Sequence, residues 1–200
     1  MRRLVHPIER ESYRIMRAMV DTSGLPRHSR DVAERIVHTT ADPAWIGDLV
    51  LDEAALSRAA QALSSGAALI TDVRMVAAGV TAREAVCFVN SGRVSVPSGK
   101  TRAAAGIAHA ATLHPAGAVW VVGNAPTALT ELLMLAAKGE VEPEMVIGLP
   151  VGFVGAAESK LALRESGLPQ LSNVSARGGS NVAAAAVNAL LYGDPLEDEK

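Results

Sequence analysis

The chain has 200 residues, the length of one domain, and its hydrophobic fraction of 49% is large enough for a buried core. A net charge of −2 excludes the basic surface that nucleic acid binding requires, and 3% aromatic residues argue against a base-stacking platform. No window approaches the roughly 18 apolar residues of a membrane span. The single cysteine, Cys87, excludes a disulfide framework. We therefore expect one domain over 1–200, in the cytoplasm.

The first third of the chain has the apolar spacing of helices. Apolar residues recur every three or four positions over 8–20, with charged residues between them. Further helices are predicted over 29–40 and 52–65, and the acidic residues that open the third suit a helix N-terminus.

Short apolar runs bounded by turn signals follow. We predict five strands from them, over 67–71, 85–89, 118–122, 145–149 and 171–175. Continuous rather than alternating hydrophobicity is typical of strands that are covered on both faces. Helices are predicted between and after them, over 101–113, 126–138, 156–165 and 180–191. The alternation predicts an α/β fold of the flavodoxin-like type, a mainly parallel five-stranded sheet with helices on both faces, and a disordered tail over 196–200.

Polar turns follow three of these strands, at 123–129, 150–160 and 176–181. In parallel sheets of this kind, ligands bind beyond the carboxyl ends of the strands. Free backbone N–H groups at the start of a helix favour an anion, and Lys160 and Arg177 lie in or beside these turns. The turns together predict a multi-point carboxylate cradle, although any single one is equally explained as a tight connection.

Two glycine motifs resemble nucleotide-binding loops but fail on spacing. The segment 98–101 (SGKT) resembles the end of a phosphate loop, yet Val94 stands where that pattern requires glycine. Gly148, Gly152 and Gly155 are spaced GxxxGxxG rather than GxGxxG, which excludes a dinucleotide fingerprint.

One histidine remains as a candidate for acid–base chemistry. His109 and His114 fall on different faces of one predicted helix, and no histidine has a neighbour at zinc spacing, so no metal site is expected. His38 lies near the end of a predicted helix, where the helix dipole favours a protonated imidazole, and Arg35 lies one turn earlier on the same face. Histidine titrates near neutral pH and is the commonest general acid–base group; the alternative is a surface or capping residue.

Six motifs carry a resemblance that spans about residues 6–191. They are HPIERESY (6–13), RIVHTTAD (35–42), ITDVRMVAAGV (70–80), GNAPTAL (123–129), GLPVGFVGAAESK (148–160) and RGGSNVAAAAVNAL (177–190). In this order and at these spacings they resemble the precorrin-8X methylmutase family, the isomerases of cobalamin (vitamin B12) biosynthesis.

The resemblance implies migration of a methyl group from C-11 to C-12 of precorrin-8X or cobalt-precorrin-8. The product would be hydrogenobyrinic acid or its cobalt counterpart, and no cofactor would be used. It implies that His38 is the catalytic acid that protonates the macrocycle, and that Ser12 and Arg35 contact the substrate. It also implies a homodimer with the site near the subunit interface.

The acetate and propionate arms of such a macrocycle call for further carboxylate-binding groups. We expect these substrate-binding residues to be Arg102, Asn124, Thr127, Gly178 and Ser180. The sequence departs from the family at Tyr13, where phenylalanine is usual, and after Arg102, where a serine is common. Two other functions stay open: a non-catalytic tetrapyrrole carrier, and a nucleotide-binding switch, against which the failed phosphate loop argues.

Overall fold

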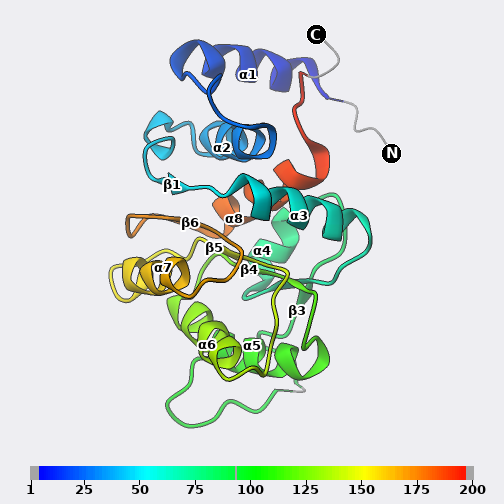
Figure 1. Ribbon diagram of the computed structural model, residues 1–200, viewed down its shortest axis with the longest axis vertical. Coiled ribbons are helices and arrows are strands. Elements are labelled where there is room, and N and C mark those ends of the chain that lie inside the picture. Colours follow the sequence, from blue (N-terminus) through cyan, green and yellow to red (C-terminus); the bar gives the residue numbers. More distant parts are fainter. Residues whose placement is uncertain (1–4, 93, 197–200) are drawn as a thin grey trace.

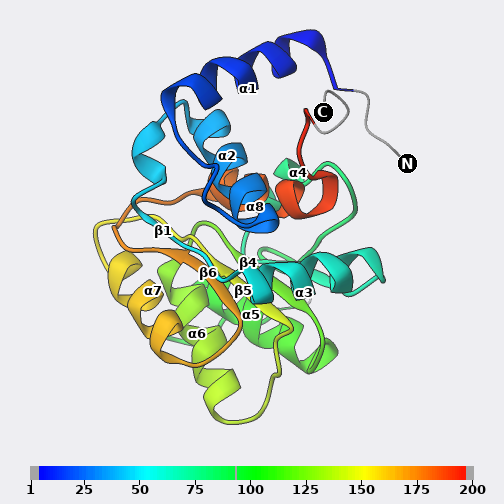
Figure 2. The ribbon, with the colours of Figure 1, turned by 45° about the horizontal axis from the view of Figure 1, so that its top comes forward.

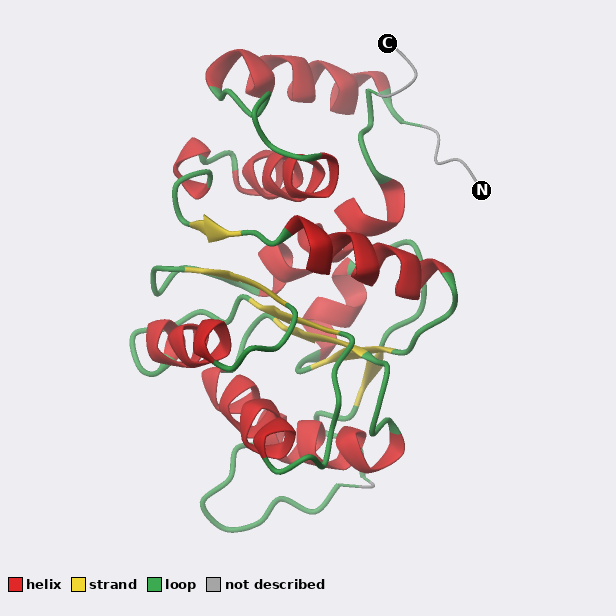
Figure 3. Cartoon of the chain, viewed as in Figure 1, coloured by secondary structure: helices red, strands yellow, loops and turns green. Residues whose placement is uncertain are grey.

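The computed structural model describes residues 5–92 and 94–196, and shows a central sheet with helices on both faces (Figures 1 and 3). Residues 197–200 of the predicted disordered tail lie outside the described residues. Within the described ranges, the search for a helix of sufficient length and apolarity to cross a membrane found none.

Over 5–92 and 94–196, the sheet has six strands in the order β1-β6-β5-β4-β2-β3. They are β1 (Leu49–Val50), β2 (Leu69–Thr71), β3 (Val86–Cys87), β4 (Val119–Val122), β5 (Met145–Gly148) and β6 (Gln170–Asn173). The five predicted strands are β2 to β6. They pair in parallel with the strand order 2-1-3-4-5 of flavodoxin-like folds, which confirms the predicted class. The sixth strand, β1, was not predicted and adds an antiparallel edge to β6.

Strand β4 shows why the strands read as continuous apolar runs. All four of its residues are buried. Val119 and Val121 belong to the apolar core on one face of the sheet, and Trp120 and Val122 belong to the core on the other. Both faces are therefore covered, as the lack of alternation predicts.

Within the described residues, three helices pack against each face. One face carries α3 (Glu53–Ser64), α4 (Arg74–Gly79) and α8 (Ser180–Tyr192), and the other carries α5 (Arg102–Leu113), α6 (Pro126–Ala137) and α7 (Ala156–Glu165). The short helix α4 was not predicted. Two more helices, α2 (Arg27–Thr40) and α1 (Pro7–Met19), extend the first side: α2 packs on α8, and α1 packs on α2 as the outermost element (Figure 2).

Helix α2 runs antiparallel to α8, and this brings the end of α2 to the carboxyl edge of the sheet. The end of α8, at Gly193, lies beside Arg27 and Asp31 at the start of α2. At the other end, Arg177, just before α8, forms a close ion pair with Asp42, just after α2. His38 in the last turn of α2 therefore lies on the side of the molecule where the parallel strands end.

Candidate functional site

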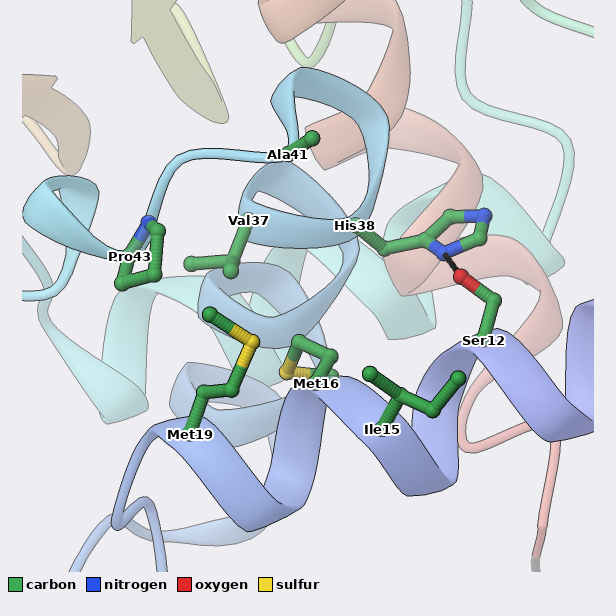
Figure 4. A pocket seen from close by; sticks show the side chains of 8 residues that line it. All are labelled: Ser12, Ile15, Met16, Met19, Val37, His38, Ala41 and Pro43. Atoms are coloured by element: carbon green, nitrogen blue, oxygen red, sulfur yellow. Dashed lines mark hydrogen bonds between the residues drawn. The ribbon is translucent and has the colours of Figure 1, made fainter.

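His38 and Ser12 form the centre of the first candidate site. The Ser12 Oγ lies 2.9 Å from Nδ1 of His38, and the two side chains point toward one another from α1 and α2 (Figure 4). The Tyr13 ring stacks on the imidazole with a centroid distance of 4.7 Å and an interplanar angle of 30°. The imidazole is thus held at one nitrogen and on one face.

Local sequence signals place the two helices that carry these side chains. Helix α1 begins with Pro7 at its first position, and the His6 Nδ1 accepts a hydrogen bond from the backbone N–H of Ile8. Helix α2 ends at Thr40, because its C-cap, Ala41, has a left-handed φ of 52° and stops the helix within one turn of His38. The imidazole therefore lies in the last turn, beside the helix carbonyl groups.

This arrangement suits an acid that acts from Nε2. In the imidazolium form, both ring nitrogens are donors, and Nδ1–H donates to the Ser12 Oγ. After Nε2 gives up its proton, the neutral ring keeps Nδ1–H and the same hydrogen bond to Ser12. Figure 4 shows Nε2 directed away from Ser12. The serine can therefore fix the orientation of the ring through a full cycle of proton transfer.

The pocket beside His38 has a volume of about 240 Å³ and an apolar lining (Figure 4). Its lining residues are Ser12, Ile15, Met16, Met19, Val37, His38, Ala41 and Pro43. Such a surface suits the face of a flat conjugated ring. Pockets that enclose a drug-sized ligand measure roughly 300–1,000 Å³, so this one holds only part of a large macrocycle.

Arg35 is buried next to this pair, with 8% of its surface exposed. Its Cζ lies 5.9 Å from the centroid of the Tyr13 ring, and its Nη1 lies 3.7 Å from the Glu9 Oε1. Among residues 5–92 and 94–196, its Nε and Nη2 have no hydrogen-bond partner. Buried donors are rarely left unpaired, so these two atoms have the capacity to donate to an acceptor that the described residues do not supply. Burial also raises the pKa of the Tyr13 phenol, although the Arg35 charge opposes that shift, and the ring stays neutral at physiological pH.

A second, larger pocket of about 410 Å³ lies where β2 and β4 end. The strand order reverses between these two strands, which is where ligands bind in folds of this type. Three of the predicted substrate-binding residues line it, together with a second arginine and other polar residues: Arg102, Asn124, Thr127, Arg74, Asn90 and Thr101. A hydrogen bond of 2.7 Å between the Thr101 and Thr127 hydroxyls joins the starts of α5 and α6.

The turn between β4 and α6 does not offer free N–H groups to an anion, which corrects the sequence-based interpretation. The Asp72 carboxylate, directly after β2 and 1% exposed, already accepts hydrogen bonds from the three backbone N–H groups of this turn. It bonds to the N–H groups of Gly123 (3.0 Å), Asn124 (2.9 Å) and Ala125 (2.8 Å). A ligand in the second pocket must therefore be held by side chains. An acid directly after a buried strand was the sequence signal for this contact.

Lys160 does not belong to a ligand cradle either. Its Nζ is fully buried and donates to the Asn173 Oδ1 (2.8 Å) and to the carbonyls of Ser175 (2.5 Å) and Arg177 (2.6 Å). Burial lowers the pKa of Lys160 to about 8, so the ammonium is still charged at neutral pH. The Arg177 guanidinium pairs with Asp42 and lies 4.4 Å from the centroid of the Trp45 ring. Both cations have internal partners.

The predicted site residues thus fall into three groups. Ser12, Arg35 and His38 lie together between α1 and α2, whereas Arg102, Asn124 and Thr127 line the separate second pocket. The described residues that line these two pockets do not include the other two, Gly178 and Ser180, at the start of α8. Asp72 and Arg74 were not among the predicted site residues, although both closely follow the predicted strand 67–71 and lie in the motif 70–80.

The described part of the chain, 5–92 and 94–196, contains no group of three or more His, Cys, Asp or Glu residues placed to hold a metal ion.

Comparison with known proteins gives one consistent result. A family model described as precorrin-8X methylmutase matches residues 7–193. A precorrin-8X methylmutase of Pseudomonas aeruginosa is 40% identical over 92% of this chain and 93% of its own length. A cobalt-precorrin-8 methylmutase of Methanothermobacter thermautotrophicus is 39% identical over 93% and 92%. The crystal structure of the precorrin-8x methyl mutase of Thermus thermophilus superposes with a TM-score of 0.82 at 32% identity, over 92% of this chain and 96% of that one.

Proposed function

This chain belongs to the precorrin-8X methylmutase family, the isomerases of cobalamin biosynthesis, and from that premise we propose that it moves a methyl group from C-11 to C-12 of a corrin precursor. The substrate is precorrin-8X or its cobalt counterpart, and any cobalt enters and leaves as part of the substrate. The product is an isomer, so the reaction needs no external reagent.

His38 is the acid in this proposal. Its Nε2–H protonates the conjugated macrocycle. The added proton withdraws electron density from the ring system and makes the methyl shift easier. The methyl group then moves with its bonding pair from C-11 to C-12, and a proton returns from the macrocycle to Nε2. The observation that carries the proposal is the Ser12 contact of 2.9 Å to Nδ1, because it fixes the orientation of the imidazole beside the apolar pocket.

In this proposal, Arg35 and Arg102 bind the carboxylate arms of the macrocycle. The unpartnered Nε and Nη2 of Arg35 suit one arm, because a guanidinium binds a carboxylate with two parallel hydrogen bonds. Arg102, with Asn124 and Thr127 beside it, suits another in the second pocket. Gly178, just before α8, and Ser180, its first residue, are further substrate-binding residues in this proposal.

A homodimer completes the site in this proposal. The pocket of about 240 Å³ leaves most of a macrocycle uncovered, and two of its lining residues, Ile15 and Met19, are 57% and 66% exposed. A second copy of the chain would cover both. Light scattering on the purified protein tests this, and a monomer with full activity would contradict it. A cytoplasmic location fits an enzyme whose single cysteine, Cys87, is free.

The decisive variant is His38→Ala. Incubation of the wild type with precorrin-8X changes the absorption spectrum as product forms, and we expect the variant to bind the substrate but leave the spectrum at its starting form. His114→Ala, a change of the same kind at the end of α5, is the control and keeps its activity. Turnover by His38→Ala at the wild-type rate would refute the role of His38. Binding without turnover by the wild type would favour the carrier function.

A further inference from the structure

Helix α1 brings Ser12 to His38, yet little apolar packing holds it there. Only Tyr13 and Met16 are buried among its described residues, whereas Ile8, Ile15 and Met19 are 57–74% exposed. The helix is the outermost element of its side and packs on α2 (Figures 1 and 2). Since hydrophobic stabilisation follows the apolar area removed from water, this helix needs another anchor.

Arg17 provides that anchor through two buried acids. Its Nε and Nη2 donate to the Glu34 Oε2 at 3.0 and 2.6 Å, and Nη2 also donates to the Asp194 Oδ1 at 2.8 Å. The Glu34 and Asp194 side chains are only 2% and 4% exposed. The other Glu34 oxygen, Oε1, accepts a hydrogen bond of 2.6 Å from the Thr22 hydroxyl. One guanidinium thus ties α1 to α2 and to the segment after α8.

The geometry of this anchor fixes where α1 lies along α2. Arg17 follows Tyr13 by four residues, so both side chains lie on the face of α1 that meets α2. A rotation or a sliding of α1 that removed Ser12 from His38 would also separate Arg17 from Glu34. Because a buried carboxylate without its partner is strongly unfavourable, the cluster resists such a movement.

We propose that Arg17 is a positioning residue that holds Ser12 against Nδ1 of His38 and thereby sets the orientation of the imidazole. The proposal rests on the function proposed above. It differs from a general role in stability, because it requires the effect of Arg17 on turnover to pass through Ser12.

A double-mutant cycle tests this requirement. We expect Ser12→Ala and Arg17→Met each to lower kcat by about fivefold to tenfold, the worth of one hydrogen bond in the transition state, with smaller changes in KM. In Ser12→Ala, the further change Arg17→Met should lower kcat by no more than about twofold, since the contact that Arg17 fixes is already gone. If the double variant instead loses kcat by the product of the two single losses, the two residues act independently and the proposal is overturned.

Two further variants keep the test decisive. Arg14→Met removes an arginine of the same helix that is 52% exposed, and should leave kcat unchanged. If Arg17→Met does not fold, Asp194→Asn replaces it in the cycle, because that change weakens the anchor while Glu34 keeps its partner. The same lack of additivity is then expected, and additive losses would again contradict the role.

A measurement without substrate separates this proposal from the proposed function. The ¹⁵N chemical shifts of the His38 ring report the hydrogen bond at Nδ1 whether or not the protein turns over. We expect Arg17→Met to shift the Nδ1 signal in the same direction as Ser12→Ala, and Arg14→Met to leave it in place. A wild-type Nδ1 signal in Arg17→Met would overturn the positioning role, whereas inactivity of the wild type would bear only on the function.

Discussion

Gly178 shows, at the scale of a residue, how closely the backbone packs where the strands end. A Cβ atom at this position would lie 2.3 Å from the Leu149 carbonyl oxygen and 2.4 Å from that of Pro150. Both are backbone atoms and cannot rotate away. The glycine of the RGGS motif is therefore required by the approach of two loops, which is a structural reason for a residue that the sequence suggested as a ligand contact.

Gly178→Ala should consequently lower the free energy of unfolding by about 1–3 kcal/mol, the usual cost of overpacking. Urea denaturation followed by circular dichroism measures this. Gly24→Ala is the matched control, because a Cβ at Gly24 would have no atom within 4 Å, and we expect little change there. Equal stability of the two variants would show that the loops can separate without cost.

The residues also show what the sequence could and could not tell about the site. His38 could be selected from the sequence as a candidate acid because it lies near a helix end, and the resemblance added Ser12 and Arg35, which the structure places beside it. That Lys160 is fully buried was not foreseeable, since lysine is seldom buried unless paired, and its three acceptors come from the distant segment 173–177. Contacts of that kind are set by the tertiary fold rather than by local pattern.

At the scale of elements, the parallel strands were predictable and the edge strand was not. Strands β2, β4 and β5 lie in continuous apolar runs because both faces are covered, whereas β6 (QLSN) is largely polar and gives a weaker signal. Strand β1 has two residues, too few to show a period, and its pairing of Leu49 with Asn173 joins positions far apart in the sequence. The six-residue helix α4 is likewise too short to show an amphipathic period. The positions of β1 and α4 are therefore set by contacts with other elements of the fold rather than by local sequence pattern.

Asp72 joins two elements, and its replacement tests how the second pocket is built. Burial raises the pKa of Asp72, and the N–H groups of Ala125, Gly123 and Asn124 oppose that shift. In Asp72→Asn, the amide NH₂ would face one of these donors, so at least one N–H loses its acceptor. We expect a loss of about 1–3 kcal/mol in the free energy of unfolding and a higher KM, because Asn124 and Thr127 follow the disturbed turn.

The control for Asp72→Asn is Asp52→Asn at the start of α3. Asp52 also accepts from two backbone N–H groups, of Ala54 and Ala55, but at an exposed helix end. Asparagine caps a helix about as well as aspartate, so the free energy of unfolding and KM of Asp52→Asn should both stay at their wild-type values. A wild-type KM in Asp72→Asn would mean that the turn after β4 does not shape the substrate site.

At the scale of the whole molecule, two acids join the N-terminal layers to the sheet. Asp48, next to β1, accepts hydrogen bonds from Asn173 Nδ2 (2.8 Å) at the end of β6 and from Ser175 N (2.8 Å) and Oγ (2.7 Å) just after it. Glu53, at the start of α3, accepts from the backbone and side chains of His28 and Ser29 at the start of α2. The Glu53 contacts join α2, which carries His38, to α3, and the Asp48 contacts join the segment before β1 to β6.

The two acids predict a loss of stability in acid. Burial alone would raise the pKa of both carboxyls, but the hydrogen bonds from Ser175 and Asn173, and from His28 and Ser29, outweigh it and hold both pKa values below the usual range. A group with a lowered pKa in the folded state stabilises the protein above the pKa of the unfolded chain, about 4, and this contribution disappears as the pH falls through the folded value. The free energy of unfolding, from urea denaturation at fixed protein concentration, should therefore fall from pH 5 to pH 3. Asp48→Asn should reduce the slope over that interval, because the amide does not titrate; slopes that match the wild type would show that protonation of Asp48 does not weaken the contact between β1 and β6.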